Sequence, residues 1–179
     1  MGFADGSIQV WDVANATVLY TLSGAHNGTV LALKYMNYKR FASGGADSLL
    51  KVWDLDRGFA ILTLAGHTGC VCCLVQLSPE LLASGSWDRS IRVWEVESGR
   101  CVRTMTGHQH WVCALALLEK PTDGGQQQRL VSGSADGSIR VWSVATGQCV
   151  AMVAERQDYG GVFSLALNSK NELVSGSYR

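Results

Sequence analysis

The sequence predicts an all-β fold made of repeated antiparallel sheets, and three observations lead to this prediction. Similar segments recur along the 179 residues, each ending in a tryptophan: Trp11, Trp53, Trp94 and Trp142. Apolar runs of strand length recur between turn residues, at 30–36, 71–77, 112–118 and 162–168. Twenty glycines occur against two prolines, which suits many tight turns between short strands. No helical periodicity of useful length competes with this pattern.

The composition is that of a globular chain and limits the classes of partner. Hydrophobic residues make up 47% of the chain and the formal net charge is zero. Such a balance creates no field that would attract nucleic acid or an anionic membrane. The chain has no apolar run of transmembrane length and no signal-peptide pattern at its start. We therefore expect neither a nucleic-acid partner nor a membrane.

Six cysteines raise the question of a metal or redox site. They are Cys70, Cys72, Cys73, Cys101, Cys113 and Cys149. No second Cys/His pair with zinc spacing accompanies the cluster at 70–73, so we expect no metal and no cofactor. Cys72 and Cys113 are equivalent in the repeat, as are Cys101 and Cys149, which predicts small buried residues. Free thiols indicate a reducing compartment, cytoplasmic or nuclear.

The repeat keeps strict spacing between four residue types. An aspartate precedes each tryptophan by six residues, and a serine precedes the last three tryptophans by ten. A histidine lies seventeen residues before Ser43 and before Ser84. His108 precedes Ser132 by twenty-four, because the segment 120–128 lengthens that connection. We expect this Gly/Gln-rich insertion to be a flexible, solvated loop.

These features resemble the WD40 repeat family, over essentially the whole chain. The resemblance is carried by the period, by the pairs Gly66-His67 and Gly107-His108, and by endings such as Trp11-Asp12 and Trp53-Asp54. It implies an all-β, WD40-type β-propeller, whose blades are four-stranded antiparallel sheets around a central channel.

The repeat register divides this single WD40 domain, residues 1–179, into five parts. They are a half blade at 1–23, full blades at 24–65, 66–106 and 107–154, and a half blade at 155–179. The two halves could join and close a four-bladed ring, or the chain could be part of a larger ring, typically of seven blades. Residues 1–5 and 175–179 both align with 132–136, so the halves overlap. This favours a larger ring completed by further blades.

His67, Ser84 and Asp88 have the residue types of a hydrolase triad. The same trio recurs in two other repeats, whereas one active site needs one nucleophile, and no G-x-S-x-G turn accompanies these serines. We therefore expect no catalytic residues and no enzyme. The family resemblance implies instead a buried network in which Asp accepts from His, His is linked to Ser, and Ser to the indole N–H of Trp. The predicted network residues are His26, Ser43, Asp47, Trp53, His67, Ser84, Asp88, Trp94, His108, Ser132, Asp136 and Trp142.

The pattern has two departures. The glycine–histidine pair is interrupted in the first full unit, which reads Gly24-Ala25-His26. In the last unit Asp158 takes the place of the histidine, so we expect the terminal half blade to lack a complete network. Lys51, Arg92 and Arg140 recur two residues before a tryptophan, and we expect them to form a solvated edge whose stems cover apolar surface.

The candidates for a protein-binding surface are residues that depart from the repeat pattern at positions expected to be exposed. Trp87 stands where the other units have alanine, and Trp111 opens a strand where the others have Thr, Cys or Gly. Neighbouring blades could bring the two indoles together, with Arg89, His110 and Gln109 at their edge, a composition typical of interface hot spots. Alternatively, Trp111 packs into a neighbouring loop and Trp87 covers the channel mouth.

The resemblance implies a platform function rather than chemistry. We expect a non-catalytic protein–protein interaction scaffold within a multi-protein complex, which binds other proteins or peptides through the propeller rim. The alternative is the substrate-receptor propeller of a ubiquitin ligase complex, because such proteins often carry WD40 propellers.

Overall fold

The computed structural model describes residues 1–118, 128–155 and 160–178. In these residues the chain forms sixteen β-strands and no helix. The described residues therefore contain no helix that is long and apolar enough to span a membrane. The strands form three four-stranded and two two-stranded antiparallel sheets. The insertion predicted at 120–128 lies outside the described residues except for Gln128, whose side-chain amide donates to the carbonyl oxygen of Leu77 (2.5 Å).

The sheets follow one another along the chain. The N-terminal half blade holds β1 (Ile8–Asp12) and β2 (Thr17–Leu22), and the C-terminal half blade holds β15 (Gly161–Leu167) and β16 (Leu173–Tyr178). The full blades are β3 (Val30–Tyr35), β4 (Arg40–Gly45), β5 (Leu50–Asp54) and β6 (Phe59–Leu64); β7 (Val71–Gln76), β8 (Leu81–Ser86), β9 (Ile91–Glu95) and β10 (Cys101–Met105); β11 (Val112–Leu118), β12 (Arg129–Ser134), β13 (Ser138–Ser143) and β14 (Cys149–Glu155). Each full blade is a meander in which consecutive strands pair.

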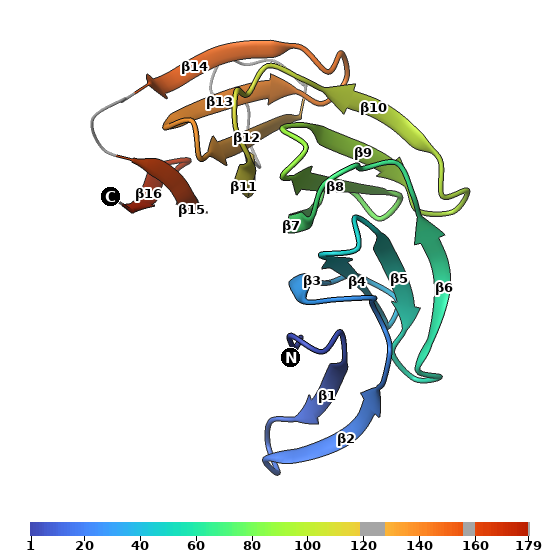
Figure 1. The fold of residues 1–179 in the computed structure, drawn as a ribbon. Helices are drawn as coiled ribbons and strands as arrows, with labels where there is room; N and C mark the ends of the chain where they lie inside the picture. Colours follow the sequence, from blue (N-terminus) through green and yellow to red (C-terminus); the bar gives the residue numbers. More distant parts are fainter. Residues whose placement is uncertain (119–127, 156–159, 179) are drawn as a thin grey trace.

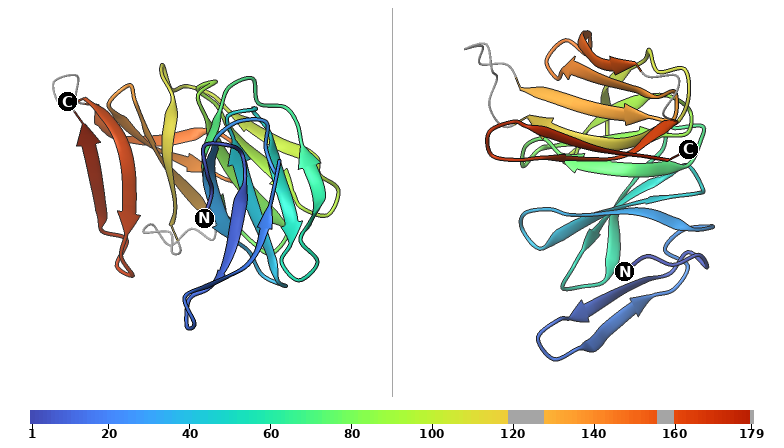
Figure 2. Two further views of the ribbon diagram at one scale, coloured as in Figure 1. Left: turned by 60° about the horizontal axis from the view of Figure 1, so that its bottom comes forward. Right: turned by 90° about the vertical axis from the view of Figure 1, so that its left-hand side faces the viewer.

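The blades are arranged as an open arc (Figure 1). The first strands, β3, β7, β11 and β15, line the concave side, and β6, β10 and β14 lie at the outside. The two half blades lie at opposite ends of the arc (Figures 1 and 2), so they do not form a shared blade. The all-β prediction of three full blades and two halves of an incomplete propeller is confirmed, and the closed four-bladed ring is wrong for this chain.

The innermost strands share a bulge near their start. In β7 the pairing passes from Val71–Ser86 to Cys73–Gly85, so Cys72 has no opposite residue. The same break leaves out Leu31 in β3, Cys113 in β11 and Phe163 in β15. A bulge inserts one residue and increases the local twist of its strand. The bulge therefore changes the direction of one side chain in each first strand, at equivalent positions along the concave side.

Glycines in the second strands let neighbouring blades approach closely. A Cβ added to Gly44 would lie 2.7 Å from Val71 Cγ1, and one added to Gly133 would lie 2.6 Å from Val162 Cγ1. Likewise, a Cβ added to Gly85 would lie 2.8 Å from Val112 Cγ1. In each case the valine belongs to the first strand of the next blade. Only a residue without a side chain fits there, because the interior is already packed to near van der Waals contact.

The tryptophans that end the third strands fill the space between blades. Trp94 and Trp142 are each 1% exposed and Trp53 is 6% exposed. Each lies in a cluster that also contains apolar residues of a neighbouring sheet. Trp11 of the N-terminal half blade is 40% exposed, because this half blade has no described blade on its other face.

We predict that Gly133→Ala destabilises the fold by about 1–3 kcal/mol, the usual cost of adding a methyl group to a packed interior. The added Cβ would overlap Val162 Cγ1. In a Val162→Ala background the same substitution should cost less, because the overlapping methyl group is gone. Urea unfolding of the four proteins of this double-mutant cycle measures the coupling. Equal costs in both backgrounds would show that the blade contact is not the cause.

Candidate protein-interaction site

Four side chains of the second full blade form a continuous hydrogen-bonded chain. His67 Nδ1 lies 2.7 Å from Asp88 Oδ2, and His67 Nε2 lies 2.8 Å from Ser84 Oγ. Trp94 Nε1 donates to the same Ser84 Oγ at 2.8 Å. A carboxylate only accepts, so Nδ1 carries the proton and Nε2 accepts from the serine hydroxyl. Every polar group in the chain of bonds then has a partner.

The same arrangement occurs in the other two full blades. In the first, His26 contacts Asp47 (2.9 Å) and Ser43 (2.6 Å), and Trp53 donates to Ser43 (2.8 Å). The inserted Ala25 therefore does not prevent the network. In the third, the corresponding distances are 3.0 Å for His108 to Asp136, 2.6 Å for His108 to Ser132 and 2.7 Å for Trp142 to Ser132. Asp158, the departure in the last unit, lies outside the described residues.

Burial separates these trios from a hydrolase site. The three histidines are 3–6% exposed, and the three serines are fully buried. Each serine hydroxyl already accepts a hydrogen bond from the indole N–H and donates one to the histidine. A nucleophile must reach its substrate, and here the indole of the same blade occupies that side of the oxygen. The geometry is that of a structural network, and we call the Asp–His–Ser–Trp hydrogen bonds of each blade the lock.

The sequence analysis missed a further member of the network. Ser90 Oγ donates to Asp88 Oδ1 at 2.6 Å, and Ser138 Oγ does the same to Asp136 Oδ1. Both hydroxyls are buried. The signal was present as a serine two residues after the aspartate in three of the four units, Ser7 included. The carboxylate also accepts the backbone N–H of Thr68, the residue after His67.

The network shifts the titration of its acids and bases. Burial raises the pKa of Asp88, but hydrogen bonds from His67 and Ser90 outweigh this and hold it well below the ordinary value. The pKa of Asp136 is lowered in the same way against the effect of burial, with Ser138 as the main donor. Burial lowers the pKa of His108 by more than the Asp136 carboxylate raises it. The resting network of the third blade therefore contains a charged Asp136 and a neutral His108.

The basic residues do not form the solvated edge that we expected. Lys51, Arg92 and Arg140 are half-buried, and Lys51 Nζ donates to the Ala25 carbonyl at 2.5 Å. Arg92 Nε is buried and has no hydrogen-bond partner among the described residues. A Cβ on Gly66 would lie 2.9 Å from Arg92 Nη1 and 3.1 Å from Trp94. The guanidinium packs over the glycine that precedes the network histidine, which explains a glycine there.

Two tryptophans from neighbouring blades stack on the rim that carries the aspartate turns. The ring centroids of Trp87 and Trp111 lie 4.3 Å apart with planes at 13°. Each side chain remains 38% exposed. Trp87 comes from the β8–β9 turn and Trp111 precedes β11. The indoles therefore pack on each other and still present aromatic surface.

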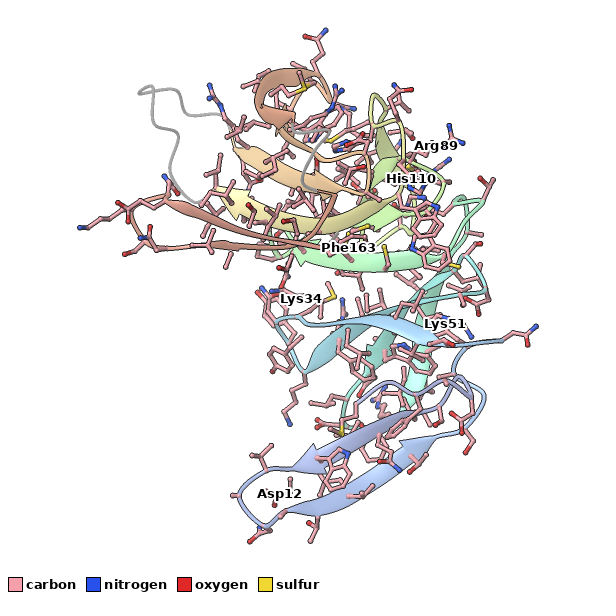
Figure 3. All side chains as sticks on the ribbon, turned by 60° about the vertical axis from the view of Figure 1, so that its left-hand side comes forward. Asp12, Lys34, Lys51, Arg89, His110 and Phe163 are labelled. Atoms are coloured by element: carbon pink, nitrogen blue, oxygen red, sulfur yellow. The ribbon has the colours of Figure 1, made fainter. Side chains whose placement is uncertain are left out.

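Polar side chains surround the stack. His110 meets Trp111 edge-on, with centroids 4.7 Å apart. Arg89 and His110 both lie at this rim (Figure 3) and are exposed, as is Gln109. Arg89 has a φ of 70°, in the left-handed region, and the equivalent turn residues Gly6 (80°), Ser48 (66°) and Gly137 (81°) share this conformation. The left-handed conformation therefore belongs to the aspartate turn of the repeat, and Arg89 is the largest side chain that adopts it there. We call Trp87, Arg89, Gln109, His110 and Trp111 the rim patch.

The cysteines are less buried than expected. All six are free thiols; five are partly exposed and Cys149 is exposed. Cys72 and Cys113 are bulge residues of first strands, and Cys149 begins the outer strand β14. Cys72 Sγ still contacts the next blade, at 3.0 Å from the carbonyl oxygen of Val112. Among residues 1–118, 128–155 and 160–178, no cluster of three His, Cys, Asp or Glu residues could hold a metal ion.

Comparison with known proteins agrees with the geometry of the blades. The family described as WD domain, G-beta repeat matches residues 16–54, 58–95 and 99–143, more than half of the chain. The chain belongs to the WD40 family. A crystal structure of the WD40 β-propeller domain of Doa1 superimposes with a TM-score of 0.85 at 25% identity. The match covers 98% of this chain and 56% of that one.

Curated relatives match this WD40 chain over short stretches. Cell division control protein 4 of Saccharomyces cerevisiae is 39% identical over 66 residues, 37% of this chain and 8% of that protein. The F-box/WD repeat-containing protein sel-10 of Caenorhabditis elegans is 37% identical over 61 residues, 34% and 10% of the two chains. Mitochondrial division protein 1 of Kluyveromyces lactis is 34% identical over 59 residues, 33% and 8%. The matched stretches span a tenth or less of these relatives.

We predict that Trp94→Ala destabilises the WD40 chain by about 3–5 kcal/mol, because a fully buried indole leaves a cavity. Asp88→Ala should cost about 1–3 kcal/mol, because the His67 Nδ1–H loses its acceptor. Urea unfolding measures both. Exposed Phe59→Ala is the control and should change stability little. Unchanged stability in both network variants would contradict the lock.

Acid should destabilise the chain in two stages. The folded pKa of His108 is below its ordinary value of 6.5, so the unfolded state takes up protons first and stability begins to fall below that pH. The folded pKa values of Asp88 and Asp136 are below 3.8, so a second loss begins below that pH. Asp88→Asn should reduce the loss of stability in the second stage and leave the loss in the first stage unchanged. Urea midpoints at a series of pH values test this; an unchanged acid slope in Asp88→Asn would refute it.

Proposed function

We propose that this chain is a non-catalytic scaffold that binds another protein or peptide through the rim patch. The observation that carries the proposal is the exposed stack of Trp87 on Trp111, built by two blades at positions where the other repeats have small residues. Aromatic side chains with a neighbouring arginine are enriched at the centres of interfaces. WD40 propellers serve generally as interaction platforms.

Two further observations support a patch made for binding. The stack is preformed, because each indole holds the other in place, so little side-chain freedom is lost when a partner binds. Arg89 is exposed in the turn that carries Trp87 and adds a positive charge beside the stack. The patch thus combines rigid apolar area with a cation at its edge.

The absence of catalysis is part of the proposal. The His/Ser/Asp trios of the described blades are part of the buried network. In each blade the tryptophan indole contacts the serine hydroxyl and blocks the approach of a substrate. We also propose that the partner is not nucleic acid, since the net charge of zero offers no phosphate-binding field. A cytoplasmic or nuclear location agrees with six free thiols.

A second candidate function is substrate recognition within a ubiquitin ligase. It is favoured by two relatives, the F-box/WD repeat-containing protein sel-10 and the E3 ubiquitin-protein ligase COP1 of Arabidopsis thaliana, the latter 29% identical over 68 residues. An F-box or RING-type segment in the same polypeptide would decide for it. Both candidate functions require the same rim patch.

We predict that the double variant Trp87→Ala/Trp111→Ala recovers bound protein at a level at least about tenfold lower than wild type. The measurement is quantitative mass spectrometry after pull-down on the immobilised chain. Stability should change little, because the stack lies at the surface. Phe59→Ala, which removes an exposed aromatic side chain from the outer strand β6, is the matched control and should bind as wild type. Full recovery by a folded double variant would remove the rim patch from the proposal.

A further inference from the structure

The loop between β2 and β3 contains the pair Asn27-Gly28, the one place in the sequence where glycine follows asparagine. Asn27 is exposed. Within the described part of the chain, neither the Asn27 side-chain amide nor the Gly28 backbone N–H has a hydrogen-bond partner. Glycine also lacks the Cβ that would hinder an approach to its nitrogen. The Gly28 nitrogen is therefore accessible to the side-chain carbonyl carbon of Asn27.

The other asparagines lack this combination. Asn168 precedes serine, a small residue, but its Oδ1 accepts two backbone N–H groups, at 2.9 Å each. The remaining three precede residues that carry a side chain, namely alanine, tyrosine and glutamate after Asn15, Asn37 and Asn171. Asparagine is among the thermally labile residues of proteins, and Asn27 is the one that this structure leaves most open to reaction.

Asn27 takes part in the lock of the first full blade through its backbone. Its N–H donates to Asp47 Oδ2 at 2.9 Å, and Asp47 Oδ1 lies 2.9 Å from His26 Nδ1. Burial raises the pKa of Asp47, but hydrogen bonds outweigh this and lower it, and the Asn27 N–H contributes most among them. A change at Asn27 therefore reaches the carboxylate that holds the histidine.

The residues on either side of Asn27 are anchored to two aspartate turns. His26 N–H donates to the carbonyl of Gly6 at 3.0 Å, in the turn of the N-terminal half blade. Ala46 N–H, in the turn of the first full blade, donates to the carbonyl of Thr29 at 2.9 Å. The main chain between His26 and Thr29 therefore has a fixed span. An additional main-chain atom there would strain or break one of these bonds.

We propose that Asn27 is a deamidation site, and that its isoaspartate product opens the hydrogen bond between His26 and Asp47. The lock of the first full blade is then broken, whereas the locks of the other two full blades remain intact. The reaction and the opened bond concern this chain alone and do not depend on the proposed function.

The reaction needs only water. The Gly28 nitrogen attacks Cγ of Asn27, so an N–C bond forms, the Cγ–Nδ2 bond breaks, and ammonia leaves with the proton of the Gly28 N–H. Water then opens the cyclic succinimide at either of its carbonyl carbons. Opening at Cγ gives aspartate with the original main chain. Opening at the backbone carbonyl carbon gives isoaspartate, in which Cβ has become a main-chain atom.

The chain itself supplies the control substitutions. The residue after the network histidine is Thr68 in the second full blade and Gln109 in the third, and each backbone N–H donates to the aspartate of its blade, at 3.1 and 2.8 Å. Asn27→Thr and Asn27→Gln should therefore keep the lock and remove the fast reaction. Asn27→Asp, measured before incubation, has the aspartate product with the main chain unaltered.

The experiment incubates the folded, isotope-labelled chain at slightly alkaline pH and follows two quantities over time. Peptide mass spectrometry measures deamidation at each asparagine and separates aspartate from isoaspartate. NMR measures the protected imidazole Nδ1–H signals of the three network histidines. We expect Asn27 to deamidate at least about tenfold faster than Asn168, a difference of about 1.4 kcal/mol in activation free energy. The His26 signal should be lost in proportion to isoaspartate, while the His67 and His108 signals persist.

Four results would overturn the proposal. They are deamidation of Asn27 no faster than that of Asn168, a His26 signal that survives full conversion to isoaspartate, an equal loss of that signal in Asn27→Thr and Asn27→Gln, and its loss in Asn27→Asp before incubation. The last result would show that the new charge, and not the lengthened main chain, opens the bond. Pull-down with the unmodified chain tests the proposed function separately.

Discussion

The structure depends on one constraint, which is that a buried indole N–H needs a partner. A tryptophan is large enough to fill the space between two blades, but its nitrogen cannot be left without an acceptor there. In each full blade a serine oxygen accepts a hydrogen bond from the indole N–H. The serine hydroxyl donates a hydrogen bond to a histidine, and the histidine donates one to an aspartate at the rim. The bonds run from the blade interior to the turn, so packing and turn geometry are fixed together.

This lock also determines what the rim can present. The aspartate is held by the histidine, by a following serine and by backbone N–H groups, so the turn that carries it is rigid. Trp87 and Arg89 flank Asp88 in that turn and cannot avoid the surface. The next blade supplies Trp111 from the loop after its own locked histidine, His108. A structural network thereby positions a recognition surface without belonging to it.

The close contacts between blades connect the same surface to the concave side. Glycines in the second strands admit the first strand of the next blade, and bulges in the first strands leave one residue per blade outside the ladder. In β7 and β11, the first strands of the two blades that supply the stacked indoles, the bulge residues are Cys72 and Cys113.

The sequence by itself determined the blades, because strict spacing of Asp, Ser, His and Trp can recur only if each repeat folds alike. Strand ranges read from apolar runs and turn residues agree with the structure to within two residues. It could not determine burial of the basic residues or the openness of the cysteines, since these depend on which sheet covers which face. Trp87 and Trp111 could be singled out as departures from the repeat. Their 4.3 Å stack was decided only by the packing of two blades, because contacts between residues distant in the chain are set by tertiary structure.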